Sequence, residues 1–217
     1  MKTFISYSSD IKRTAGRIKD YLDKYGFNCF LAHEDIPPQT EWPTAILQML
    51  EKCDLFLPLL TPDFTTSFFC QQETGFAYCR KVEILPVMIS EAPMGMIANI
   101  QAVSLNKEQF EISCWKIVKH VAKNTTLSGP VLNALIKEFG ESSTYDDAYD
   151  RAEKLLNEFH FNQQQIKAIR KHIKNNSQIN ETKKVRDTIF QFIRNHPDFF
   201  DNDFVEWYDR KSRTWMR

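Results

Sequence analysis

The chain has 217 residues, enough for one large domain or for a domain and a half, and its 42% of hydrophobic residues can fill a core. The 28 basic and 28 acidic residues cancel, and division after residue 124 leaves 13 basic and 14 acidic residues in the first part, then 15 and 14 in the second. Neither part has the excess charge of a protein that binds nucleic acid or a membrane surface, so we expect no partner of either kind.

The first 124 residues alternate between short apolar runs, typical of buried strands, and segments with helical spacing. The predicted strands are residues 4–7, 27–32, 54–60, 83–89 and 101–105. The predicted helices are residues 15–25, 42–52, 67–80 and 107–123, with Gly26 as the C-cap of the first. This alternation predicts an α/β domain over residues 1–124, with a five-stranded parallel sheet flanked by helices and right-handed crossovers.

The strand pattern stops at residues 125–130, Thr-Thr-Leu-Ser-Gly-Pro, which we interpret as a turn-rich linker. Apolar residues then recur at helical spacing within residues 131–139, 145–159, 166–173 and 185–193. Asn162 and Asn180 stand where helix N-caps are expected. The sequence therefore predicts a small all-α module over residues 125–217.

One carboxylate is notable for its position along the chain. Glu73 lies on the predicted helix that follows the buried strand 54–60. Because open parallel sheets bind their ligands at the carboxyl ends of the strands, we expect Glu73 to lie at that edge. The alternative is a solvated glutamate on an amphipathic helix, which would have no part in chemistry.

Six short segments follow one another at compatible spacings. They are Phe4-Ile-Ser-Tyr-Ser8, Ala15-x-x-Ile18-x-x-x-Leu22-x-x-x-Gly26, His33-Glu-Asp-Ile-Pro-Pro-Gln-Thr-Glu-Trp42, Cys53-Asp54, Ser67-x-x-Cys70-x-x-Glu73 and Leu85-Pro86-Val87. This ordered set resembles the TIR (Toll/interleukin-1 receptor) domain in its bacterial form. The resemblance covers about residues 1–123, and the helical part resembles no family that we recognise.

The resemblance implies a flavodoxin-like fold and, as in many bacterial and plant members, cleavage of the nicotinamide–ribose bond of NAD+. Enzymatic members share a glutamate on the helix after the third strand, with a serine and often a Trp-Cys pair ahead of it. Glu73, Ser67, Phe69 and Cys70 fall on these positions, with Phe69 in place of the usual tryptophan. Gln39 stands where the family's loop often has glycine, which leaves the conformation of that loop open.

On this basis Glu73 would stabilise a ribosyl cation, and NAD+ would be a substrate and not a cofactor, because the chain has no Gly-x-Gly-x-x-Gly or P-loop motif. The other residues expected to contact the substrate are Ser6, Ser8, Ser9, His33, Asp35, Trp42, Ser67, Phe69 and Cys70. Structural roles are the alternatives: Ser8, Ser9 or Asp10 as the cap of the next helix, Trp42 as a core residue, and His33 and Asp35 as groups that hold their own loop.

The five cysteines are odd in number and lie mostly in apolar runs, which favours reduced core residues over disulfides or a zinc site. No pair of histidines has metal-ligand spacing, so we expect no metal. No run approaches 18 apolar residues and no basic leader precedes the first strand, so we expect a cytoplasmic protein.

The leading functional prediction is an NAD+ nucleosidase, or a cyclase of the same mechanism, that gives nicotinamide and ADP-ribose or a cyclic ADP-ribose isomer. Similar bacterial proteins make such isomers as signals in antiphage defence. The resemblance also implies self-association through TIR–TIR contacts at the loop of residues 33–41, and an effector or activating protein as a further partner. Two alternatives stay open: a non-enzymatic adaptor that acts through TIR–TIR contacts or interferes with a host's signalling, and a nucleoside deoxyribosyltransferase-like enzyme.

Overall fold

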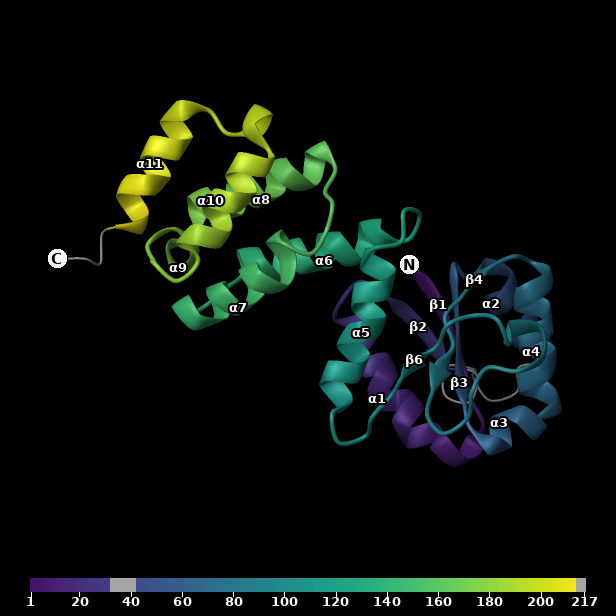
Figure 1. The fold of residues 1–217 in the computed structure, drawn as a ribbon. Helices are drawn as coiled ribbons and strands as arrows, with labels where there is room; N and C mark the ends of the chain where they lie inside the picture. The colour runs from purple at the N-terminus through teal and green to yellow at the C-terminus, as the bar shows by residue number, and fades with distance from the viewer. Residues whose placement is uncertain (32–41, 214–217) are drawn as a thin grey trace. The chain divides into compact units, whose positions relative to one another are not determined.

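The computed structural model describes residues 1–31 and 42–213, which form two compact units, Met1–Pro130 and Val131–Arg217 (Figure 1). The predicted linker between them was wrong in its second half. Helix α6, Ser128–Gly140, already begins there. A helix tolerates Pro130 in its first turn because the amide hydrogen that proline lacks has no partner at that position.

The first unit is built on a parallel sheet. Its strands are β1 (Lys2–Ser6), β2 (Asn28–Leu31), β3 (Leu55–Leu60), β4 (Glu83–Ile84), β5 (Val87–Met88) and β6 (Val103–Ser104). Their order in the sheet is β2-β1-β3-β5-β6. The short strands β4 and β5 follow one another along the same side of β3, so together they take the place of one strand, and the six described strands fill five positions in the sheet. This confirms the predicted five-stranded flavodoxin-like sheet. The predicted strand 83–89 is interrupted at Pro86, which has no amide hydrogen to donate.

Helices cover both faces of the sheet (Figure 1). Helices α1 (Lys12–Asp23) and α5 (Phe110–Ala122) pack together on one face, and α2 (Trp42–Lys52) and α4 (Phe68–Cys79) pack together on the other. The predicted helix 67–80 is preceded by a separate short helix, α3 (Pro62–Thr66). Gly26 has a positive φ of 81°, but it lies two residues beyond Lys24, the C-cap of α1, so the predicted cap was misplaced.

A row of aromatic rings shows which side of β1 faces α2 and α4. Phe4 pairs in register with Phe30 of β2 and Phe56 of β3, with ring centroids 5.4 and 5.8 Å apart. These rings belong to a buried cluster that includes Leu50 of α2 and other apolar residues of α2 and α4. Successive strand residues alternate between the two faces, so Ser6 lies on the same face as Phe4. The last residue of β1 therefore faces α2 and α4.

The second unit is helical, as predicted. After α6 its helices are α7 (Tyr145–Leu156), α8 (Gln163–Asn175), α9 (Ser177–Asn180), α10 (Arg186–Asn195) and α11 (Asn202–Ser212). Asn162 forms the predicted cap of α8, in a capping box with Gln165. Asn180 is not an N-cap. It ends α9, and its amide donates to the carbonyl groups of Ile173 and Lys174, 2.9 and 3.1 Å away at the end of α8.

No helix in residues 1–31 and 42–213 is long and apolar enough to cross a membrane. Basic residues near the end of the chain are paired within the second unit. Lys211 of α11 lies 2.9 Å from the carboxylate of Glu181, and Arg213 lies 3.0 Å from that of Asp209.

Gly140, the last residue of α6, lies against the imidazole of His172 in α8. A methyl group added at this glycine would overlap the ring of His172. We expect Gly140→Ala to lower the free energy of unfolding of the second unit by about 1–3 kcal/mol, measured by urea denaturation. Gly129→Ala in the same helix is the matched control, because its added methyl meets nothing within 4 Å and alanine favours helix. Equal destabilisation by both substitutions would contradict the expectation.

Candidate active site

Glu73 lies on the face of α4 that packs against the sheet. Ser67 sets the start of this helix, because its hydroxyl accepts a hydrogen bond from the backbone N–H of Cys70 at 3.4 Å. Cys70, Glu73 and Ala77 then recur at helical spacing, and all three are buried, with 8% of Glu73 exposed. The interpretation of Glu73 as a solvated residue was therefore wrong.

The side chain of Ser6 meets the Glu73 carboxylate from β1. The Ser6 hydroxyl donates a buried hydrogen bond of 2.5 Å to Oε2 of Glu73. Ser6 is the last residue of its strand, and strand alternation already directs it toward α4. This contact places Glu73 at the carboxyl edge of the sheet, as the sequence predicts, although it lies in the middle of its helix.

Burial changes the acidity of Glu73. Removal from water raises the pKa of Glu73 from its ordinary 4.5 to about 7, and the hydrogen bond from Ser6 opposes this rise without cancelling it. Within the described residues no cation contributes to the shift. Near neutral pH the carboxyl group is therefore divided between its two protonation states, and a positive charge that develops beside it would favour the ionised form. Such a group is typical of a functional site.

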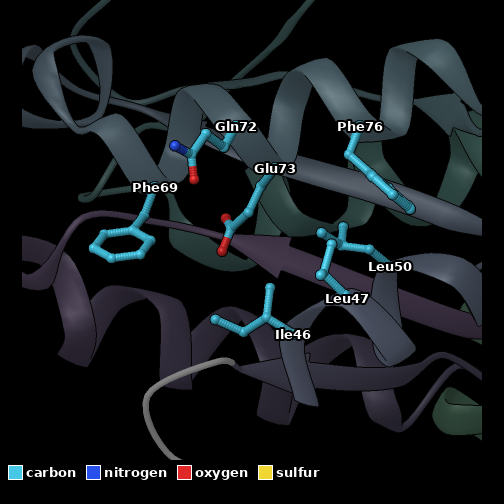
Figure 2. A pocket seen from close by; sticks show the side chains of 7 residues that line it. All are labelled: Ile46, Leu47, Leu50, Phe69, Gln72, Glu73 and Phe76. Carbon is cyan, nitrogen blue, oxygen red and sulfur yellow. The ribbon is translucent and has the colours of Figure 1, made fainter. Parts of the chain in front are cut away.

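In the described part of the chain, two hollows adjoin Glu73. The first, which we call the apolar cavity, has a volume of about 210 Å³ between α2 and α4 (Figure 2), and is lined by Ile46, Leu47, Leu50, Phe69, Gln72, Glu73 and Phe76. The second, the hydroxyl cavity, has a volume of about 320 Å³ at the ends of β1 and β3, and is lined by Ile5, Ser6, Tyr7, Ser8, Ser9, Asp63, Ser67, Phe69, Cys70 and Glu73. Phe69 and Glu73 line both, so the carboxylate stands between an apolar space and one bordered by several serine hydroxyl groups.

Seven of the ten predicted site residues meet in the hydroxyl cavity: Ser6, Ser8, Ser9, Ser67, Phe69, Cys70 and Glu73. His33 and Asp35 lie outside the described residues. Trp42 begins α2, as predicted from the sequence, but its side chain lies outside them as well. The fold thus brings together two segments, residues 6–9 and 67–73, that lie far apart in the sequence.

Ser8 has a hydrogen-bonding role within the protein. Its hydroxyl donates to the carboxylate of Asp10 and lies 3.0 Å from the hydroxyl of Thr61, the residue after β3. Ser8 precedes a short 3-10 helix, Ser9–Ile11, but its side chain makes no capping bond to it. Ser8 thus occupies the N-cap position of this helix, as the alternative predicts, but its side chain does not cap the helix and instead ties together the loops that follow β1 and β3.

Cys70 is suited to packing and not to nucleophilic attack. It is 3% exposed, and burial raises the pKa of its thiol, with a smaller contribution in the same direction from the charge of Glu73. The reactive thiolate is therefore disfavoured at neutral pH. In the described part of the chain, no cluster of three or more His, Cys, Asp or Glu side chains could hold a metal ion.

Sequence reasoning missed two sets of residues around the site. Thr61 and Asp63 follow β3 directly, so the rule that located Glu73 could have found them at the same sheet edge. The apolar cavity was missed because its opposite walls come from α2 and α4. The spacing of Phe69, Gln72 and Phe76 marks one side of α4, but no local pattern says which helix faces it.

A family model described as "TIR domain" matches residues 3–117, more than half of the chain. Among solved structures, the TIR domain of the Toll-related receptor TRR-2 from Hydra magnipapillata aligns with a TM-score of 0.47 and 13% identity, over 54% of this chain and 94% of that one. A search of curated proteins gave no match. The family match, on a parallel α/β unit with the expected strand order, shows that the chain belongs to the TIR domain family.

Proposed function

We propose that the TIR domain of this chain cleaves the nicotinamide–ribose bond of NAD+, as a glycohydrolase or as a cyclase of the same mechanism. The observation that carries the proposal is the position of Glu73. Its carboxylate is buried, is hydrogen-bonded to Ser6, and stands between the apolar cavity and the hydroxyl cavity. The flat pyridinium ring would lie against the apolar side chains of the first cavity and the ribose against the hydroxyl groups of the second, with the carboxylate beside the bond that breaks.

The chemistry needs a carboxylate but no strong acid. When the bond between ribose C1′ and the pyridinium nitrogen breaks, its electron pair goes to the nitrogen, and nicotinamide leaves as a neutral molecule. Positive charge then moves onto the ribosyl group, where ionised Glu73 stabilises it. Water attacks C1′ and loses a proton to solvent, which gives ADP-ribose. Attack by the adenine or by a hydroxyl of the same molecule, which then loses its own N–H or O–H proton to solvent, gives a cyclic isomer.

Ser6 has a positioning role in this scheme. Its hydroxyl occupies one acceptor site on Oε2, while an ionised carboxylate offers about four such sites. Among the described residues Ser6 is the hydrogen-bond donor to Glu73, so the remaining sites can accept hydrogen bonds from the ribose hydroxyls as charge develops on the sugar. Ser6 thereby fixes the rotamer of the carboxylate that acts on the ribosyl cation.

We also propose that assembly of several copies completes the site, and that an activating or effector protein acts with it in antiphage signalling. Phe68 and Phe69 support the first part of this proposal, because they are 84% and 55% exposed at the start of α4. Large apolar side chains exposed beside a site are typical of interaction surfaces. The same exposure favours the second candidate function, a TIR module that acts only through contacts and has no catalytic activity.

The test is incubation of the purified chain with NAD+ over a wide range of protein concentrations, with and without a crowding agent. Chromatography and mass spectrometry resolve nicotinamide, ADP-ribose and cyclic isomers. We expect nicotinamide release that rises more steeply than in proportion to protein concentration. Absence of release under every condition would overturn the proposal and favour the contact-only module. Turnover of nucleosides without turnover of NAD+ would indicate a deoxyribosyltransferase-like enzyme.

A further inference from the structure

Gln72 lines the apolar cavity but has no role in the bond cleavage described above. It precedes Glu73 on α4, and Phe69 and Phe76 flank the pair one helical turn away on either side. Figure 2 shows the Gln72 amide on the same side of α4 as the Glu73 carboxylate. In the described part of the chain, the remaining walls of this cavity are aliphatic or aromatic. Among the described residues that line this cavity, Gln72 is thus the uncharged side chain that can form hydrogen bonds with a ligand.

We propose that Gln72 recognises the carboxamide on the pyridinium ring and makes the site selective for nicotinamide over nicotinate. This inference rests on the proposed function and adds a determinant of specificity to it. The apolar walls hold a flat ring by contact area, which depends little on the ring's substituent. A primary amide has both donors and an acceptor, so Gln72 can donate one hydrogen bond to a carboxamide and accept another from it.

Electrostatics act in the same direction. Glu73 is the one charged side chain among the described residues that line the apolar cavity. A nicotinate ring carries a carboxylate in place of the carboxamide, and this second negative charge would lie near ionised Glu73 between apolar walls. Nicotinate also cannot donate a hydrogen bond to the Gln72 carbonyl oxygen. The dinucleotide that carries nicotinate therefore loses one hydrogen bond and gains a repulsion.

The chain offers a matched control in the preceding residue. Gln71 has the same side chain on the same helix, but its amide donates to the backbone carbonyl of Phe64 at 3.1 Å and lines neither cavity. Substitution at position 71 therefore removes an amide from α4 without changing the groups that face the ring. Comparison of the two positions separates recognition of the substrate from a general disturbance of the helix.

The experiment measures kcat/KM for NAD+ and for nicotinic acid adenine dinucleotide in the full chain and in Gln72→Ala, Gln72→Lys and Gln71→Ala. We expect Gln72→Ala to reduce the preference for NAD+ by about 5- to 10-fold, the value of one good hydrogen bond. Gln72→Lys should move the preference toward the nicotinate dinucleotide, because its ammonium pairs with the added carboxylate. Gln71→Ala should keep the wild-type preference. An unchanged preference in both Gln72 variants would overturn the proposal.

Binding of free nicotinamide and free nicotinic acid, measured by saturation-transfer NMR on the same variants, keeps the two proposals distinguishable. Weaker binding of nicotinamide to Gln72→Ala, with nicotinic acid unaffected, would support the role of Gln72 even if no variant cleaved NAD+, and the proposed function alone would then fail. Cleavage of NAD+ by the wild type with equal binding of both compounds to every variant would refute the role of Gln72 alone.

Discussion

Replacement of Glu73 by glutamine is expected to lower nicotinamide release from NAD+ by about 100- to 1,000-fold, because removal of one preorganised group that stabilises transition-state charge has effects of this size. Glutamine preserves the shape of the side chain and can still hydrogen-bond to Ser6, but it cannot carry the negative charge that the ribosyl cation requires. The loss should therefore appear in kcat more than in KM.

Glu83→Gln is the matched control for this substitution. Glu83 is an exposed carboxylate on β4 that pairs in register with Leu55 at the start of β3, so it lies at the opposite edge of the sheet from Ser6 and Glu73. Its replacement should leave the rate unchanged. Circular dichroism of both variants should match that of the wild type. Release at the wild-type rate by Glu73→Gln would show that another group does the chemistry.

The pH dependence offers an independent check on the same residue. Burial holds the pKa of Glu73 at about 7, so the ionised form increases as the pH rises from 6 to 8. We expect kcat/KM to rise through this range and to level off above it, because kcat/KM reports the ionisation of the free enzyme. A bound pyridinium ring brings a positive charge to the carboxylate, so the rise in kcat should occur at lower pH. A flat profile would be inconsistent with Glu73 as the reactive carboxylate.

The sequence was sufficient to predict the parallel sheet, because each buried strand forms a continuous apolar run and each helix has its own apolar face. Helix α2 was predicted with its observed bounds, Trp42–Lys52. Breaks within elements were harder to predict. The break in the strand at Pro86 and the separate helix α3 each depend on single backbone hydrogen bonds. The spacing of hydrophobic residues gives no information about such bonds.

The residues of the candidate site that lie at the end of a strand, or on the helix that follows one, were predictable from the sequence. Ser6 and Glu73 meet because strand alternation and helical spacing each direct one side chain to the same face of the sheet. The burial of Glu73 was less predictable, since a glutamate on a helix is usually solvated. Its neighbours Cys70 and Ala77 at helical spacing were the available signal. The apolar cavity forms where α2 packs against α4, and no local sequence pattern indicates which two helices pack together.

The same burial that prepares Glu73 for chemistry should destabilise the folded protein as the pH rises. The native pKa of about 7 exceeds the ordinary value of 4.5, so between these values the folded state binds more protons than the unfolded state. The contribution of protonated Glu73 to stability is present below pH 4.5 and is lost as the pH rises through 7. We expect a loss of about 2–3 kcal/mol from this residue between pH 5 and pH 8.5.

Comparison of the wild type with Glu73→Gln isolates this loss, because glutamine does not titrate. Glu73→Gln should gain about 2–3 kcal/mol in stability relative to the wild type between pH 5 and pH 8.5. Hydrogen exchange of amides in β1 and β3 is the suitable measurement, since it reports on the unit that contains Glu73 and not on the helical unit. Each pair of proteins is compared at the same pH, which cancels the intrinsic pH dependence of exchange.

Ser6→Ala provides the opposite change at the same site. Loss of the hydroxyl removes the hydrogen bond that lowers the pKa of Glu73, so the pKa should rise further and the loss of stability with pH should extend to more alkaline values. The order of stability at pH 8.5 should therefore be Glu73→Gln, then the wild type, then Ser6→Ala. A constant difference between the wild type and Glu73→Gln at every pH would mean that Glu73 titrates as an ordinary solvated carboxylate. Burial disfavours the ionised form of Glu73, and a cation in the neighbouring cavity would stabilise that form. The stability measurement and the catalytic proposal therefore depend on the same property, the desolvation of the Glu73 carboxylate.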